Sequence, residues 1–550
     1  MIFIYYPLIL LSILGYGFFA SKKLLNIQSR NLGHIGIVGI FLLLLYSYGT
    51  TQFFPHNKTF NLITLMVGLC FFIFLFKKFD FPKKDILILF TIMFFMIFFI
   101  LVGKNHDDFH YYHFPYILSL IEYPHPIGLG NLNLGFNTHS SIFLLSSLLY
   151  LPGIDYNLFH LYPVYINIFA NFILLKLVLK KEILNKYIFV TFLSLASLIL
   201  INIFFYRLGE YGTDRSAMVL TVLLFVNVLF FINRHDVKIN GNLLKLFLIL
   251  FTIIISLKVF YITTAILLLP LILYVYQKNK SIKLFFNLTL ILCFILFCFV
   301  IFTNFINSGC LLFPEQKTCF FDFRWSATQD TVEYLRIHFE NWAKAGSGSN
   351  YQNLNKEDYI VNFNWLNNWF DKYFFNKVSD FLLSLIFVAL IFLLLFKRSK
   401  ITKKTKRTYL FLFFLLFIIF LIWFTTHPSL RYGGYHLIFL LVFVPLSMLL
   451  EDFSRNIKNL EKKITILVTI ILIIFVGRNI NRLVKEYKIN SYNPMITTNF
   501  PVNDSSFRLS KAIKNYIVNR NVCKKQSDEC KKNIPSIEYI HKNRFIIIKK

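Results

Sequence analysis

Charged residues are scarce in this 550-residue chain: Asp, Glu, Lys and Arg together make up 15% of it, and only 27 residues are acidic. Soluble globular proteins carry about 25% charged residues. Hydrophobic residues account for 57% and aromatic residues for 19%, with a mean hydropathy of +0.61. Most of the chain is therefore unsuited to water, which excludes a soluble enzyme and indicates a polytopic membrane protein.

Several catalytic signatures are also missing. The sequence has no GxxxxGK(S/T) phosphate loop, no HExxH, no GxSxG and no CxxC. ATP hydrolysis, zinc proteolysis, serine acyl transfer and structural zinc thus lack their usual motifs. Ionisable residues, which mark ion-coupled transporters, are nearly missing from the centres of the apolar runs.

What the sequence does contain is a series of apolar runs, and a transmembrane helix needs about 20 such residues. The runs predict an all-α fold, a polytopic bundle of about 14 transmembrane helices. These helices are expected near residues 2–20, 33–51, 60–76, 85–102, 157–178, 187–205, 216–233, 244–257, 259–276, 283–305, 380–396, 408–425, 436–450 and 464–477. One re-entrant hairpin would fit 244–276 equally well.

The net charge of +30 is explained by where the 57 Lys and Arg residues stand. They concentrate in alternate hinges, most densely in KRSKITKKTKR at 397–407. The positive-inside rule places such hinges in the cytoplasm. The basic runs therefore indicate orientation in a lipid bilayer and no nucleic-acid partner.

Three segments are too long and polar to be hinges, and this orientation makes all three external. The chain then divides into N-terminal transmembrane helices (1–102), a first external loop (103–156), central transmembrane helices (157–305), a second external loop (306–379), C-terminal transmembrane helices (380–477) and an external tail (478–550). We expect helices in the loops, including an interfacial helix at 140–151, and a small appendage in the tail.

Cysteine is rare, with seven residues. Cys310 and Cys319 share the second external loop, and Cys523 and Cys530 share the tail. Because disulfides persist on the oxidising side of a membrane, both pairs are disulfide candidates, with four free thiols as the alternative.

The first external loop opens with GKNHDDFHYYHFPYI, so Asp107 and Asp108 stand just beyond the membrane edge. Adjacent carboxylates above a low-dielectric membrane tend to raise one pKa toward the range of a general base. The neighbouring polar aromatic residues are His106, His110, Tyr111, Tyr112 and His113. They suit a sugar site, whereas a divalent metal ion at Asp107, Asp108 and His106 and a plain interfacial belt are the alternatives.

Three further charges stand in or beside short external turns. In YRLGEYGTDRSAM, Asp214 either contacts a substrate or caps the following helix. In HPSLRYGGYH, Arg431 lies in a turn with two glycines, where it can grip a phosphate or extend to lipid headgroups. Lys258, between two apolar runs, has the same two interpretations.

Taken together, these features resemble a GT-C glycosyltransferase. DDFHYYHFP resembles the acidic and Tyr-His stretch of that superfamily, and IGLGNLNLGFNTHSSIF resembles a Gly-Leu-x-Asn-Leu segment in a poorly characterised bacterial membrane family grouped with these enzymes. NFINSGCLLFPEQ, FRWSAT and NWAKAG resemble later segments of the same family. In this chain the acidic pair follows the fourth expected helix rather than the first.

The resemblance implies a bacterial inner-membrane enzyme of cell-envelope polysaccharide biosynthesis, with its active face in the periplasm. It would move a sugar from a polyprenyl-phosphate carrier to a glycan, lipid or protein acceptor with inversion. Asp108 or Asp107 would be the general base, Arg431 and Lys258 would hold the leaving phosphate, and Asp214, His110, Tyr112 and His113 would contact substrate. The rival hypotheses are a surface-polysaccharide polymerase or ligase, and a transporter of lipid-linked glycans.

Overall fold

The computed structural model describes residues 1–29, 31–101, 108–154, 156–210, 213–233, 241–279, 281–346, 356–396, 406–450, 457–490, 536–541 and 544–548. Its α-helices in the first half of the chain are α1 (Ile2–Phe19), α2 (Leu32–Thr51), α3 (Lys58–Phe76), α4 (Lys83–Phe95), α5 (Phe114–Glu122), α6 (Ser141–Ser147), α7 (Leu161–Leu179), α8 (Lys181–Lys186), α9 (Ile188–Ile199), α10 (Thr213–Asn233), α11 (Gly241–Leu257) and α12 (Leu268–Asn279). Those in the second half are α13 (Leu288–Ser308), α14 (Gln329–Lys344), α15 (Lys356–Ile360), α16 (Leu366–Trp369), α17 (Ser379–Leu395), α18 (Lys406–Thr426), α19 (Gly434–Leu450) and α20 (Ile457–Asn490).

The described residues confirm an all-α bundle typical of a membrane protein, but not the count of about 14 spans. Nine helical stretches among them are long and apolar enough to cross a membrane. Four more apolar helices are shorter, at Ile188–Phe204, Gly241–Leu257, Leu410–Thr426 and Gly434–Leu450. The run expected at 85–102 forms α4 and a short 3-10 helix, Met96–Phe99, and is not among these stretches.

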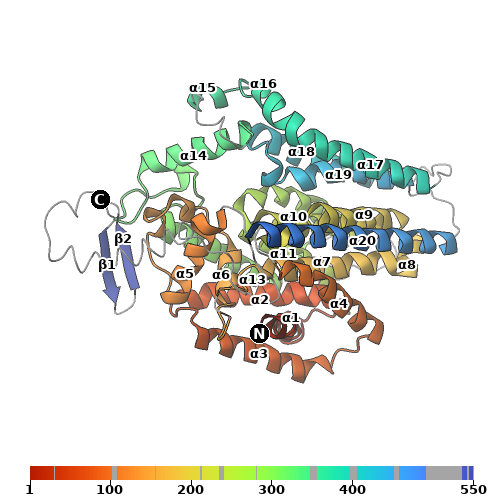
Figure 1. Ribbon diagram of the computed structural model, residues 1–550, viewed down its shortest axis with the longest axis horizontal. Coiled ribbons are helices and arrows are strands. Elements are labelled where there is room, and N and C mark those ends of the chain that lie inside the picture. Colours follow the sequence, from red (N-terminus) through yellow and green to blue (C-terminus); the bar gives the residue numbers. More distant parts are fainter. Residues whose placement is uncertain are drawn as a thin grey trace.

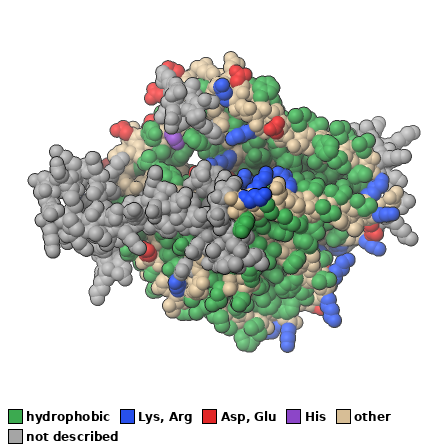
Figure 2. Space-filling model, viewed as in Figure 1, with side chains coloured by type: hydrophobic (Ala, Val, Ile, Leu, Met, Phe, Trp, Pro, Cys, Tyr) green, Lys and Arg blue, Asp and Glu red, His purple; other side chains and the backbone are tan. Residues whose placement is uncertain are grey.

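Most helices run along the long axis of the molecule, and the two ends differ in character (Figure 1). One end carries α5, α6, α14 and a two-stranded hairpin, and the other carries α8 and the C-terminal end of α17. Lys and Arg side chains gather at the latter end (Figure 2). There Lys176 pairs with Asp85 at 2.6 Å and the Lys463 ammonium donates to the Leu395 carbonyl at 2.6 Å. We call this the basic end and the opposite one the loop end.

The region around Lys258 forms two elements rather than one uniform helix. α11 ends at Leu257, Lys258 is extended (φ −156°, ψ 116°), and a 3-10 helix, Val259–Leu267, leads into α12. The stretch Val259–Asn279 is long and apolar enough to span a membrane by itself. The break therefore separates α11 from a further candidate span and leaves Lys258 at the junction.

The last helix is longer than the sequence predicted. α20 covers Ile457–Asn490, whereas the pattern indicated 464–477 followed by a tail from residue 478. The added part is held by arginines: Arg478 donates to the Ile203 carbonyl and Arg482 to the Phe98 carbonyl, each at 2.8 Å. Both carbonyls lie near the C-terminal ends of helical segments, where such groups need outside donors.

The tail ends in an antiparallel hairpin of β1 (Ser536–His541) and β2 (Arg544–Ile548). The hairpin docks on the first loop, because the Ile547 amide donates to the Ile127 carbonyl at 2.9 Å and the Asn131 side chain donates to the Ile547 carbonyl at 3.0 Å. Ile547 is fully buried.

The expected interfacial helix at 140–151 is instead a buried element. Every residue of α6 is buried, and the helix packs against α2, α5 and α7. Its serines find partners inside the protein: Ser141 bonds Ser256 at 2.8 Å and Ser146 donates to the Phe159 carbonyl at 2.8 Å. Satisfied hydroxyls allow such a short helix to lie in the interior.

Candidate functional site

Four charged side chains from four distant segments meet at the loop end. Arg431 pairs through Nη2 with Oδ2 of Asp108, 323 residues away, and its Nε donates to Oδ2 of Asp214 at 2.9 Å. The other oxygen of Asp214 accepts from the Lys258 ammonium at 2.6 Å. We call Asp108, Asp214, Lys258 and Arg431 the ion cluster.

Each member stands at a break in regular structure. Asp108 immediately precedes the helical turn Phe109–His113, and Asp214 lies in the first turn of α10. Lys258 occupies the extended junction after α11, and Arg431 lies in the short 3-10 turn Leu430–Tyr432. Helix ends leave backbone groups unpaired, and the loops beside them carry many of the binding and catalytic residues of proteins.

The turn that carries Arg431 is fixed by hydrogen bonds to three aromatic side chains. The Trp369 indole donates to the Pro428 carbonyl at 2.8 Å, the Trp423 indole donates to Ser429 at 3.1 Å, and the Leu430 amide donates to the Tyr373 hydroxyl at 2.8 Å. Gly433 follows the turn with φ of +111°, a conformation that glycine adopts without strain. The guanidinium is therefore held in place before any ligand arrives.

The cluster is partly enclosed, and its members differ in exposure. The side chain of Asp214 is 8% exposed, whereas those of Asp108, Lys258 and Arg431 are 25%, 26% and 33% exposed. Burial disfavours the charge on Arg431, but Asp214 and Asp108 outweigh this effect and raise the pKa of the guanidinium. Asp214 thus acts as the buried anion between two cations, and Asp108 is the more accessible carboxylate.

Two aromatic residues, Tyr112 and His113, follow Asp108 in the helical turn Phe109–His113. The ring of His113 is buried, 5.0 Å from Phe143 and 4.3 Å from Tyr112 between centroids. Burial lowers the pKa of His113 to about 3, so the ring is neutral at physiological pH. Burial also raises the pKa of Tyr112 well above its usual value. Both lie within the field of Asp108 and Arg431.

Other predicted site residues have separate outcomes. His106 and Asp107 lie outside the described residues, as do the side chain of His110 and the pair Cys523 and Cys530. Within the described ranges, no group of three or more His, Cys, Asp or Glu residues could hold a metal ion. The expected metal site at Asp107, Asp108 and His106 therefore stays a prediction.

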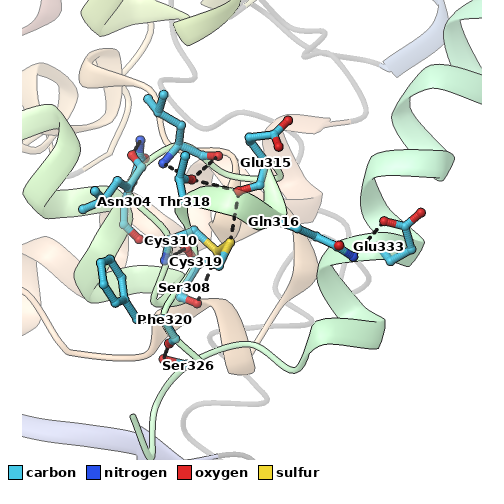
Figure 3. The surroundings of a disulfide bond; sticks show 12 residues. Asn304, Ser308, Cys310, Glu315, Gln316, Thr318, Cys319, Phe320, Ser326 and Glu333 are labelled. Atoms are coloured by element: carbon cyan, nitrogen blue, oxygen red, sulfur yellow. Dashed lines mark hydrogen bonds between the residues drawn. A yellow bond between two sulfur atoms is a disulfide. The ribbon is translucent and has the colours of Figure 1, made fainter. Parts of the chain in front are cut away.

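Cys310 and Cys319 form a disulfide. It closes a loop directly after α13, and the loop reaches α14 because the Gln316 amide donates to Glu333 at 2.8 Å (Figure 3). Free cysteines among the described residues are Cys70, Cys293 and Cys298.

Sequence reasoning missed residues that pack around the cluster. Lys258 lies over the ring of Tyr432, 5.5 Å from its centroid, and burial raises the pKa of that phenol to about 12. Tyr261, one helical turn beyond Lys258, stacks on His436 at 5.5 Å. The adjacency of Tyr432 to Arg431 was the available signal, whereas nothing in the sequence linked Tyr261 to His436.

The apolar helices indicate a helical membrane protein, and the ion cluster is its candidate functional site at the loop end. Residues 1–439 match the family model described as Domain of unknown function (DUF8201), and the chain belongs to that family. The match contains all four cluster residues and ends before α20 and the hairpin. No curated protein and no solved structure matches the chain.

Proposed function

We propose that this protein is a GT-C-like glycosyltransferase of the bacterial inner membrane that moves a sugar from a polyprenyl-phosphate carrier to an acceptor on the periplasmic face. The observation that supports this proposal is the ion cluster, in which a partly exposed carboxylate contacts a fixed arginine beside a lysine. The cluster lies at the loop end, opposite the basic end, where a periplasmic site is expected.

The two cations suit the phosphate of the donor. A guanidinium has five N–H donors and an ammonium has three, more than the carboxylates of Asp214 and Asp108 occupy in the ion cluster. A phosphate that binds Arg431 competes with Asp108 for the same donors. Donor binding would thus release Asp108 from Arg431, while Asp214 keeps both cations in place.

The reaction then follows from these positions. Asp108 accepts the proton of the acceptor hydroxyl, whose oxygen forms a new bond to the anomeric carbon. The bond from that carbon to the phosphate oxygen breaks, and its electron pair stays on the phosphate, where Arg431 and Lys258 stabilise the charge. Attack opposite to the leaving group inverts the anomeric centre.

An apolar face beside Lys258 favours a lipid-linked donor over a soluble one. The helix that follows Lys258 exposes Ile262, Leu269, Leu273 and Tyr276, with exposed fractions of 40%, 46%, 42% and 53%. Leu269, Leu273 and Tyr276 are spaced four and three residues apart, which places them on one side of α12, and Ile262 precedes them in the 3-10 helix. A polyprenyl chain can lie on this side while its phosphate reaches Lys258.

Transfer from a panel of radiolabelled polyprenyl-phosphate sugars to cell-envelope acceptors tests the proposal, with the protein in lipid nanodiscs. We expect Asp108→Asn to lower kcat by at least about 100-fold, the usual contribution of a general base, while the donor still binds. Arg431→Lys should weaken both donor binding and kcat, because lysine cannot reproduce the two contacts. The exposed Asp371→Asn serves as the matched control. Full activity of Asp108→Asn would remove Asp108 from the mechanism.

A further inference from the structure

The helix α14 carries a row of aromatic side chains that the proposed chemistry does not use. Tyr334, His338 and Trp342 are spaced four residues apart, so they lie on one face of the helix. Their ring centroids are 5.8 Å and 6.1 Å apart, and the planes of neighbouring rings differ by 30° and 25°. The row is about 12 Å long at 1.5 Å per residue. We call these three residues the aromatic row.

Both ends of α14 are tied to the segments that supply the ion cluster. Near its start, the Asn131 side chain of the first loop donates to the Trp325 carbonyl at 2.8 Å. At its end, Lys344 lies over the ring of Trp365, which contacts Trp369, the indole that bonds the turn before Arg431. α14 therefore bridges the loop of Asp108 and the turn of Arg431, and the surface beside it is hollowed, with basic side chains on the wall (Figures 1 and 2).

The charged side of α14 is satisfied within the helix and its neighbouring loop. Arg336 pairs with Glu333 at 2.6 Å, Lys344 pairs with Glu340 at 2.6 Å, and Glu333 also accepts from Gln316. These pairs stabilise the helix. The aromatic row lies on another side, where Tyr334 is 48% exposed and His338 and Trp342 are partly exposed, with Trp342 also packed against the hydrophobic core.

The aromatic row continues toward the ion cluster through Tyr111. Tyr111 is 56% exposed and stands three residues after Asp108, with its carbonyl fixed by the Asn133 side chain at 2.9 Å. Asn131, two residues before Asn133, bonds the Trp325 carbonyl just before α14, so one short stretch of the first loop contacts both Tyr111 and the approach to α14. The pKa of the Tyr111 phenol is raised by burial and by Asp108 and Tyr334, in agreement with this placement.

We propose that the aromatic row and Tyr111 bind a carbohydrate acceptor, a chain of sugar rings whose end reaches Asp108. This inference rests on the proposed function. Sugar rings present C–H faces that pack on aromatic rings, and their hydroxyls bond the Tyr, His and Trp polar atoms. A 12 Å row suits several linked rings better than one. Rigid aromatic side chains also lose little conformational entropy on binding.

Binding of chitotriose, mannotriose and maltotriose to the full chain in nanodiscs, measured by saturation-transfer NMR, tests the inference. We expect at least one trisaccharide to bind, and Tyr334→Ala and Trp342→Ala each to weaken it about tenfold, as for the loss of one aromatic contact. Phe363→Ala is the matched control, since Phe363 is an aromatic residue of the same loop that is 60% exposed. Absence of binding by all three, or equal losses in Phe363→Ala, would overturn the inference.

Membrane contact by the same aromatic row is the competing outcome. Nanodiscs that contain brominated phosphatidylcholine quench tryptophans in lipid, and the difference between wild type and Trp342→Phe isolates Trp342. We expect no quenching of Trp342, and strong quenching would assign the row to the bilayer. Asp108→Asn should retain trisaccharide binding, so loss of transfer and loss of binding are separate results. An active Asp108→Asn variant would contradict the proposed function, whereas the result on trisaccharide binding would still hold.

Discussion

At the residue scale, the two carboxylates of the ion cluster, Asp108 and Asp214, have different roles. Asp214 is nearly buried and bonds both Lys258 and Arg431, whereas Asp108 is more exposed and bonds Arg431. The sequence left open whether Asp214 caps α10 or contacts a substrate. The structure adds a third role, since Asp214 positions Lys258 and Arg431.

The positioning role of Asp214 predicts a loss of stability. Asp214→Asn leaves two partly buried cations without their shared carboxylate, so we expect the free energy of unfolding to fall by on the order of 3 kcal/mol. Asp380→Asn is the matched control, because Asp380 also lies in the first turn of a helix but is exposed. Thermal unfolding in nanodiscs measures both variants. Equal melting temperatures for the two variants would mean that Asp214 stabilises only the N-terminus of α10 and does not position the two cations.

At the scale of elements, the hydrophobic pattern predicted where helices lie but not how they end. Apolar runs indicated the central parts of α1, α2, α3, α7, α10, α13, α17 and α19 closely. The pattern missed the extension of α20 because Arg478 and Arg482 look like tail residues until the carbonyls they bond are known. It also placed α6 at the membrane surface, since only tertiary contacts reveal partners for its serines.

The docking of the C-terminal hairpin on the first loop gives a prediction with a close control. Gly128 and Gly153 have nearly equal φ values of +78° and +76°. A Cβ at Gly128 would lie 2.3 Å from the Ile547 carbonyl oxygen, whereas one at Gly153 would lie 3.5 Å from its nearest neighbour. Because the two φ values are nearly equal, alanine at either position causes similar backbone strain, and the two variants differ in the contact with Ile547.

Gly128→Ala should release β2 while Gly153→Ala should not. Hydrogen exchange followed by mass spectrometry would show at least about tenfold faster exchange of the Ile547 amide in Gly128→Ala, because its bond to Ile127 is broken. Unchanged exchange in Gly128→Ala would mean that the hairpin does not depend on this contact.

At the scale of the whole molecule, the site could be predicted only in pieces. The sequence singled out each residue of the ion cluster by itself, because a charged residue beside an apolar run is costly and is usually functional. Their meeting depends on how α10, α11 and α19 pack, and no local pattern encodes contacts across as many as 323 residues. Tyr261 and His436 carried no such mark, because aromatic residues are common throughout this chain.

The central claim is that the ion cluster faces the compartment outside the cytoplasm. Labelling of intact cells with a membrane-impermeant maleimide tests it most directly, in a parent chain in which Cys70, Cys293, Cys298, Cys523 and Cys530 are alanine. Asp330→Cys marks the exposed start of α14, and Lys181→Cys marks the basic end, where that side chain is 79% exposed. We expect Asp330→Cys to react in intact cells and Lys181→Cys to react only after permeabilisation, and the reverse pattern would contradict the account.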